Sequence, residues 1–294
     1  MTLENPAPSK WQCIKLISTG ALKEWVDQRA SSKGAALAFY TLFSMAPVLV
    51  LVIAIAGSIF GRQAAQGEIF SQLKELLGPQ GAEAVQALLI NAGNQDSGRI
   101  AAIIASLFLI AGATTVFSEL KSTLDEMWKT EEPAPGGLLS LVLTRVLSFS
   151  LVLAIAFLLL VSLAVSAALT VLERYWNGLW ADAVFILTPV SSVISFALVT
   201  CLFAVIYKLL PRVRLSWRDV WTGSAFTAAL FTLGKYAIGI YLGNSAVANS
   251  YGAAGSLVAV LLWVYYSAQI FFFGALVTRE YALRLGSLAH SHSR

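Results

Sequence analysis

The chain has 294 residues, of which 57% are hydrophobic and 12% are charged. Soluble globular domains carry about 25% charged residues, and the mean hydropathy here is +0.74. The composition therefore excludes an ordinary soluble domain and indicates a polytopic membrane domain. The formal net charge is only +4, so the placement of the Lys and Arg residues is more informative than their number.

Residues 1–33 form a polar segment in which no signal peptide is recognisable. Apolar and small residues recur there at helical spacing, at Trp11, Ile14, Ser18, Ala21, Leu22 and Trp25. Lys10, Lys15 and Lys23 lie between them. The pattern predicts an amphipathic helix on the inner leaflet, with tryptophan at the headgroups and lysine near anionic lipid. A helix packed against other cytoplasmic segments is the alternative.

Six stretches are long and apolar enough to cross a bilayer, which takes about 20 helical residues. They are Gly34 to Phe60, Ile100 to Ser118, Leu138 to Leu172, Val184 to Leu210, Val220 to Leu242 and Gly252 to Thr278. We therefore expect an all-α polytopic membrane protein. Its six-helix transmembrane domain would cover residues 34–278, followed by a cytoplasmic tail over residues 279–294.

The distribution of Lys and Arg between the predicted loops sets the orientation. Fifteen of these residues fall in the termini and the loops on one side, and four fall in the loops on the other side. Because cytoplasmic loops are enriched in Lys and Arg, both termini are predicted to be cytoplasmic. An even number of spans agrees with that result.

Two connecting segments have helical character. In the outer loop, residues 62–99, apolar stripes over residues 69–77 and 85–89 flank the run Gly78-Pro79-Gln80-Gly81. This pattern predicts a helical hairpin that caps the outer face and breaks at the Gly-Pro run. On the inner side, residues 117–132 predict a charged helix that continues the second span, and its mixed charges indicate a solvated face.

Enzyme and metal-site signatures are weak in this sequence. The two histidines, His290 and His292, lie in the last five residues and are typical of a flexible polar tail. No phosphate-binding loop or nucleophile motif is present. The basic segment PRVRLSWRD is short and follows a span, so the charge rule explains it without a nucleic acid. We expect a protein that is not an enzyme and has neither cofactor nor metal.

Lys235, followed by Tyr236, is the sharpest candidate for a substrate pathway. A lysine at the centre of a span costs about 2.5–3.5 kcal/mol on insertion scales, and such residues are functional candidates. Side chains of this span tilt towards its N-terminus, away from the nearer surface. We therefore predict that Lys235 faces the protein interior and can meet a bound anion. A lysine that snorkels to the outer headgroups is an equally supported alternative.

The first span combines Tyr40, Ser44 and Pro47 within two turns. Pro47 removes one backbone hydrogen bond and is expected to kink the helix. The hydroxyl of Ser44 can satisfy a carbonyl that the kink frees. A kinked polar face fits a cavity or a hinge, and a purely structural kink fits equally well.

The last span places Trp263, Tyr266 and Gln269 near its middle. Interfacial aromatic belts lie at the ends of spans instead. These side chains are therefore expected to face the helix bundle. They either bond to other helices, which is the main alternative, or line a cavity.

Three stretches carry a resemblance to a known family: AALAFYTLFSMAPVLVLV (residues 35–52), SELKSTLDEMW (118–128) and YGAAGSLVAVLLWVYYSAQIFFFGALVTREY (251–281). They resemble the YihY/BrkB family of bacterial inner-membrane proteins. The resemblance implies six spans with both termini inside, in the inner membrane. Members were once labelled a ribonuclease, whereas other suggestions concern transport or envelope-lipid handling. No catalytic motif carries over, and Glu280, at the family's acidic position, is explained by a local ion pair with Arg279.

Two hypotheses for the function follow. The first is a membrane protein that binds or translocates an anionic or amphipathic molecule, such as an envelope lipid. It rests on Lys235, the polar first span and the aromatic and amide side chains of the sixth span. The alternative is a non-transporting scaffold for envelope-assembly partners. An accessible cavity between the first, fifth and sixth spans would favour the first hypothesis, and a packed centre would favour the second. The oligomeric state is not determined by the sequence.

Overall fold

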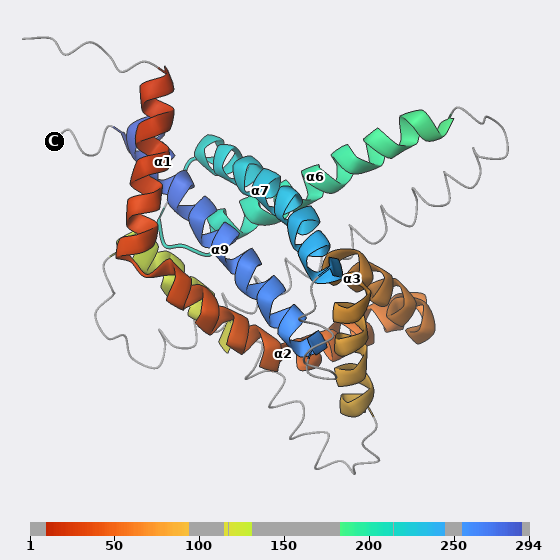
Figure 1. The fold of residues 1–294 in the computed structure, drawn as a ribbon. Coiled ribbons are helices and arrows are strands. Elements are labelled where there is room, and N and C mark those ends of the chain that lie inside the picture. The colour runs from red at the N-terminus through yellow and green to blue at the C-terminus, as the bar shows by residue number, and fades with distance from the viewer. Residues whose placement is uncertain are drawn as a thin grey trace, which may run out of the picture.

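The computed structural model describes residues 10–93, 115–116, 118–130, 183–213, 215–244 and 255–289, and all regular elements among them are helices (Figure 1). The long helices are α1 (Lys10–Asp27), α2 (Ala30–Phe60), α3 (Arg62–Gly93), α6 (Ala183–Leu209), α7 (Trp217–Asn244) and α9 (Gly255–Arg284). Residues 118–127 form a short helix. The all-helical prediction is confirmed for these residues.

Four of these helices coincide closely with predicted spans: α2, α6, α7 and α9 correspond to the first, fourth, fifth and sixth. Among the described residues, the stretches Ser192–Leu209 of α6 and Val258–Arg284 of α9 are long and apolar enough to cross a membrane. The predicted second and third spans lie largely outside the described residues. The count of six spans and the location of the termini therefore stay predictions.

Helix α9 is the centre of the described fold. It packs against α1, α2, α3 and α7, and α6 packs against α7. Figure 1 shows α9 running between α2 and α7, with α1 across its C-terminal end and α3 near its N-terminal end. In a bilayer the hydrophobic effect does not drive helices together, so this arrangement depends on close packing and hydrogen bonds between helices.

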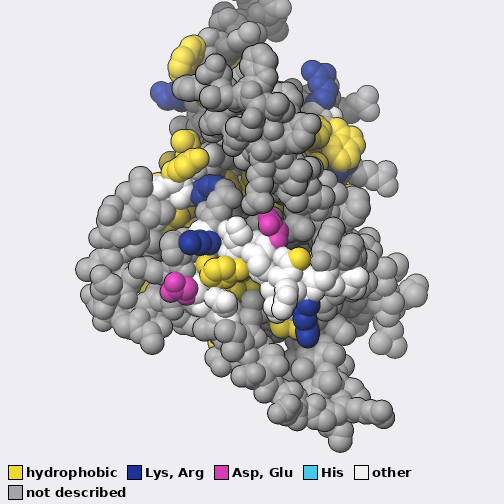
Figure 2. All heavy atoms as spheres, turned by 90° about the vertical axis from the view of Figure 1, so that its right-hand side faces the viewer, with side chains coloured by type: hydrophobic (Ala, Val, Ile, Leu, Met, Phe, Trp, Pro, Cys, Tyr) yellow, Lys and Arg dark blue, Asp and Glu magenta, His cyan; other side chains and the backbone are white. Residues whose placement is uncertain are grey.

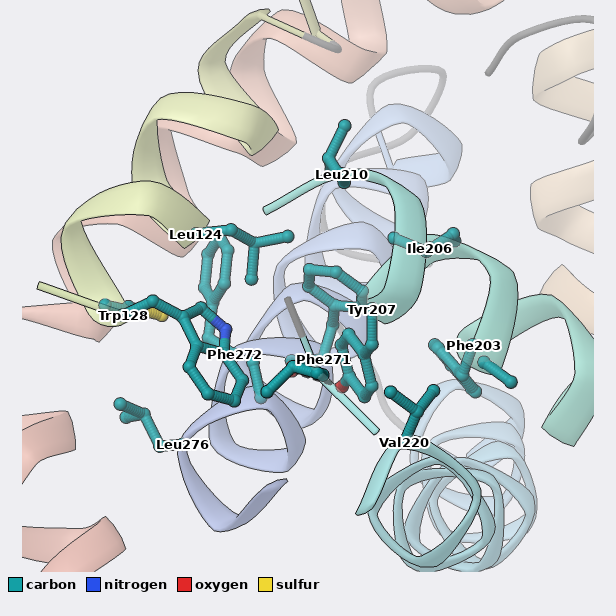
Figure 3. Close-up of a cluster of buried hydrophobic side chains, with 14 of the residues drawn as sticks. Leu124, Trp128, Phe203, Ile206, Tyr207, Leu210, Val220, Phe271, Phe272 and Leu276 are labelled. Atoms are coloured by element: carbon teal, nitrogen blue, oxygen red, sulfur yellow. Dashed lines mark hydrogen bonds between the residues drawn. The ribbon is translucent and has the colours of Figure 1, made fainter. Parts of the chain in front are cut away.

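The core lies along the C-terminal half of α9. Tyr207 and Phe203 of α6 stack with Phe271 of α9, and the ring centroids of Tyr207 and Phe271 are 5.1 Å apart. Leu124 and Trp128, from the short inner helix and its end, close the cluster on the side of Phe272 and Leu276 (Figure 3). Aromatic rings in such offset or edge contacts contribute about 0.5–1.5 kcal/mol per pair beyond their buried area.

The outer segment differs from the predicted hairpin at its turn. Helix α3 is a single element from Arg62 to Gly93, so the run Gly78-Pro79-Gln80-Gly81 does not end it. Figure 1 shows α3 bent, with its two halves running in different directions. A proline removes one helical hydrogen bond and bends a helix without having to terminate it. The predicted break is therefore wrong, and a bend replaces it.

Sharp turns separate the first three helices. Arg29, between α1 and α2, has a φ of 51° and a ψ of 44°, in the left-handed region. Gly61, between α2 and α3, has a φ of 89°. Left-handed backbone costs an L-residue such as Arg29 free energy that glycine does not incur. These turns set α1 across the end of α9 and let α3 pack against α2.

Candidate functional site

Helices α7 and α9 approach each other through three glycines, each facing a larger side chain. A methyl group on Gly223 would overlap the Thr278 side chain, one on Gly274 would overlap Thr227, and one on Gly234 would overlap the Tyr266 ring. Small residues allow such close approach of helix backbones. The described part of this interface is therefore filled, and Tyr266 is one of the groups that fill it.

The polar contacts of this interface centre on Tyr207, which the sequence did not single out. Its hydroxyl donates to the carbonyl oxygen of Phe271 at 2.7 Å and lies 3.2 Å from the Thr227 hydroxyl oxygen. The Thr227 hydroxyl also donates to the carbonyl of Gly223. The only signal for this site in the sequence was a tyrosine within an apolar run. That signal did not reveal that Tyr207 would contact Thr227 and the Phe271 carbonyl.

Gln269 lies at the contact between α9 and α2. Its amide nitrogen is 3.4 Å from the carbonyl oxygen of Ser31. Gly34 faces the same amide so closely that a methyl group there would overlap it. This is the contact between helices that the sequence offered as one alternative for Gln269.

Three polar atoms within two turns of α9 are buried without a hydrogen-bond partner among the described residues. They are the indole nitrogen of Trp263, the hydroxyl oxygen of Ser267 and the amide oxygen of Gln269. The Trp263 ring packs edge-on against Phe231 of α7, with centroids 5.6 Å apart. A buried polar group without a partner costs about 1–3 kcal/mol. These atoms are therefore available to a ligand or to water.

The predicted polar face of the first span is divided in the structure. Ser44 is buried, and its hydroxyl donates to the carbonyl of Thr41 at 3.2 Å. Tyr40 is partly exposed and packs on Phe39. Pro47 lies inside α2, which continues as one helix to Phe60. The Ser44 hydroxyl thus bonds to the Thr41 carbonyl and not to that of Phe43, the carbonyl that Pro47 leaves without its helical donor. The kink stays a prediction.

Lys235 is half-buried on α7, and Tyr236 beside it is exposed. The ammonium nitrogen lies 5.8 Å from the centroid of the Tyr236 ring, within the range of a cation–π interaction. Lys235 follows Gly234, which contacts Tyr266. The structure therefore places Tyr266 and Trp263 in the contact between α7 and α9, with Lys235 next to Gly234 on α7, whereas Gln269 lies at α2.

A network of charged side chains at the C-terminal end of α9 was missed by the sequence analysis. Arg279 of α9 lies 3.4 Å from Glu24 of α1 and 3.7 Å from Glu280, and Glu280 accepts from Arg284 at 2.9 Å. Lys129 donates to Glu24 at 2.7 Å. The expected local pair of Arg279 and Glu280 is thus only one part of a network that joins α1, α9 and the segment after the short helix.

The short inner helix is less solvated than predicted. Asp125 and Lys121 form an ion pair of 3.0 Å, and both side chains are largely buried. Asp125 also accepts from the backbone of Arg212 at 2.9 Å, because the loop after α6 packs over it. The prediction of a solvated face is therefore wrong for these two residues, whereas Glu126 is exposed and pairs with Lys33.

Stability should depend on pH through Glu24. Burial raises the pKa of Glu24, but hydrogen bonds from Lys129 and Gln28 and the charge of Arg279 outweigh it, so the pKa lies below its ordinary value of 4.5. Because the pKa of Glu24 is lower in the folded chain than in the unfolded chain, its ionised carboxylate stabilises the fold at a pH above the unfolded-state pKa. This stabilisation is lost as the pH falls through the folded-state pKa. We expect Glu24→Gln to lower the melting temperature at pH 7 and to match the wild type at acidic pH. An equal difference at both pH values would contradict this.

The charges on the face shown in Figure 2 do not gather into one patch. The described Lys and Arg side chains lie at several separate places on this face, with described acidic and apolar side chains among them. Nucleic-acid binding needs a continuous basic surface with aromatic platforms. The described residues on this face do not form such a surface.

Comparison with known proteins agrees with a membrane protein. The chain is 27% identical over 273 residues to a UPF0761 membrane protein of Psychrobacter, covering 92% of this chain and 48% of that protein. It is 26% identical over 258 residues to one of Pseudomonas aeruginosa, covering 86% and 59%. The chain thus spans about half the length of the curated relatives it matches. No solved structure matches it.

The family model described as "Virulence factor BrkB" matches residues 21–293, nearly the whole chain. The match includes all the helices that form the contacts described above, from the last turns of α1 to α9. The chain therefore belongs to the BrkB family of membrane proteins.

Proposed function

We propose that the protein binds, and can translocate, an anionic or amphipathic molecule such as an envelope lipid. It would do so in the bacterial inner membrane, with both termini in the cytoplasm. The proposal rests on one observation: the buried atoms of Trp263, Ser267 and Gln269 that lack partners among the described residues. An unsatisfied polar group is unfavourable in an apolar surrounding. A polar headgroup can offer a hydrogen bond to Trp263 or Ser267, whereas Gln269 lies on the side of α9 that faces α2.

Lys235 supplies the charge for this proposal. It is half-buried on α7 and adjoins Gly234, which contacts Tyr266, while Phe231 one turn earlier contacts Trp263. An ammonium group in an apolar span favours an anion, because pairing offsets part of the cost of burying its charge. Among the described residues, the neighbouring groups are neutral hydrogen-bonding side chains without a nucleophile and base pair. The proposed role is therefore binding and not catalysis.

The rival proposal is a scaffold that does not transport. The glycine contacts between α7 and α9 favour it, because they leave no room for a methyl group at Gly223, Gly234 or Gly274. Under the binding proposal, a ligand would have to reach Trp263 and Gln269 from the sides of α9 that face α2 and α3, because the contact with α7 is closed at these glycines. The two proposals differ in whether Lys235 contributes to binding.

Replacing Lys235 by methionine keeps the length of the side chain and removes its charge. We expect the purified Lys235→Met protein to bind a fluorescent phosphatidylglycerol, presented in neutral detergent micelles, about tenfold more weakly than the wild type. The reason is that a hydrogen bond to a charged group contributes about 1.5–3 kcal/mol. Titration followed by fluorescence anisotropy measures the change.

Lys74→Met is the matched control. Lys74 is exposed on α3 and belongs to the same predicted outer side as Lys235. This variant should bind like the wild type. If Lys235→Met also binds like the wild type while both variants elute as folded protein, the binding proposal fails and the scaffold is favoured.

A further inference from the structure

Helix α1 presents three different faces. Its buried face, with Ile17 and Ala21, packs on α9. On the same face Gly20 lies against Glu280, since a methyl group on Gly20 would be 2.6 Å from a carboxylate oxygen of Glu280. Glu24, one turn later, pairs with Arg279. This face is thus fixed to the end of α9 by packing and by charge.

The second face is an exposed apolar stripe. Trp11 is 81% exposed and Val26 is 61% exposed, and Ile14 and Leu22 are also exposed. At about 100° per residue, these four residues and Ser18 lie on one flank of the buried face. The third face carries exposed polar residues and one exposed leucine: Gln12, Leu16, Thr19, Lys23 and Asp27.

The stripe differs from the one that the sequence predicted. Ala21 is buried against α9 and Trp25 packs on the core, so both leave the predicted apolar face. Val26 joins it instead. One face of α1 therefore packs on the protein, as in the second alternative that the sequence left open. The other two faces are exposed, one apolar and one polar, as the predicted membrane-surface helix requires.

We infer that the exposed stripe of α1, with Trp11 and Val26 near its ends, docks on the headgroup region of an anionic bilayer. Three observations support this partner. The chain is a membrane protein whose α9 carries a span-length apolar run, and α1 lies across the end of that helix (Figure 1). Lys15, which lies between Leu22 and Val26 around the helix, and Lys23, beyond the stripe, are exposed. No acidic residue lies within the stripe.

This geometry matches an interfacial helix. Such helices bury an apolar face about 5–10 Å into the boundary between headgroups and acyl chains and keep lysines near anionic lipid. A tryptophan in that position keeps its ring among the acyl chains and its indole N–H in the hydrated headgroup region. The surface is separate from the groups around Lys235, so the two proposals can fail independently.

The test uses the full chain with Cys13 and Cys201 replaced by serine, in nanodiscs of phosphatidylcholine with phosphatidylglycerol. A spin label is placed at Ser18→Cys, in the stripe, or at Gln12→Cys, on the polar face. We expect the label at position 18 to be more accessible to oxygen than to a water-soluble nickel complex, and the label at position 12 to show the reverse. Adding Lys15→Glu and Lys23→Glu should raise the nickel accessibility of position 18 with phosphatidylglycerol, and much less in pure phosphatidylcholine.

Two results would overturn the inference. Equal nickel accessibility at positions 12 and 18 would mean that the stripe is in water and free for a soluble partner. A short distance between labels at position 18 of two molecules, in a double electron–electron resonance measurement, would mean that a second copy covers the stripe. If the double glutamate variant changes neither lipid mixture, the lysines do not recognise anionic lipid and that part of the inference fails.

Discussion

Replacing Gly274 by valine is expected to destabilise the protein by about 3 kcal/mol, because this position has no room for a side chain. Its first carbon would overlap the Thr227 hydroxyl and would lie 2.7 Å from the Tyr207 hydroxyl oxygen. Helices α7 and α9 would have to separate, and the contact between Tyr207 and Thr227, 3.2 Å long, would be lost with them. The branched side chain of valine enlarges the overlap.

Thermal unfolding in mild detergent, followed by size-exclusion chromatography, measures this effect. The expected loss corresponds to a melting temperature lower by about 10 °C. Gly67→Val is the matched control, because nothing lies within 4 Å of a methyl group at Gly67 on α3. That variant should stay within about 0.5 kcal/mol of the wild type. Equal melting temperatures for the two variants would show that α7 and α9 are not in this close contact.

Replacing Glu280 by glutamine should destabilise the protein by about 2–3 kcal/mol. The Arg279 side chain is only 11% exposed and the Glu280 side chain only 9%. Removing one charge from a buried pair leaves the other uncompensated, which typically costs about 3–5 kcal/mol. The lower value is expected here because Arg284, the second partner, is 40% exposed and is screened by solvent.

Glu83→Gln provides the same chemical change at an exposed position of α3. It should leave the melting temperature unchanged. The loss in Glu280→Gln should persist in high salt, because buried pairs are screened less than exposed ones. A loss that disappears in high salt would mean that Glu280 acts from a solvated position and that the network does not hold α1 on α9.

Local features of the sequence determined the helical class and the approximate ends of α2, α6, α7 and α9. In a bilayer every backbone group must bond within its own segment, so a long apolar run becomes a helix without help from neighbours. The same reasoning identified Gln269 as a group that contacts another helix or a cavity. Its contact with Ser31 and Gly34 is of the first kind.

Contacts between distant residues were decided only by the tertiary structure. Arg279 pairs with Glu24, and Tyr207 meets both Thr227 and the carbonyl of Phe271. Such contacts depend on the relative rotation and register of two helices, which no local pattern specifies. The same limit explains the predicted solvated face of Asp125, which the loop after α6 covers. The sequence by itself determined which segments are helices, because charge and hydropathy are local properties of a segment. The packing of those helices decided which polar groups meet, because the register between two helices depends on both of them.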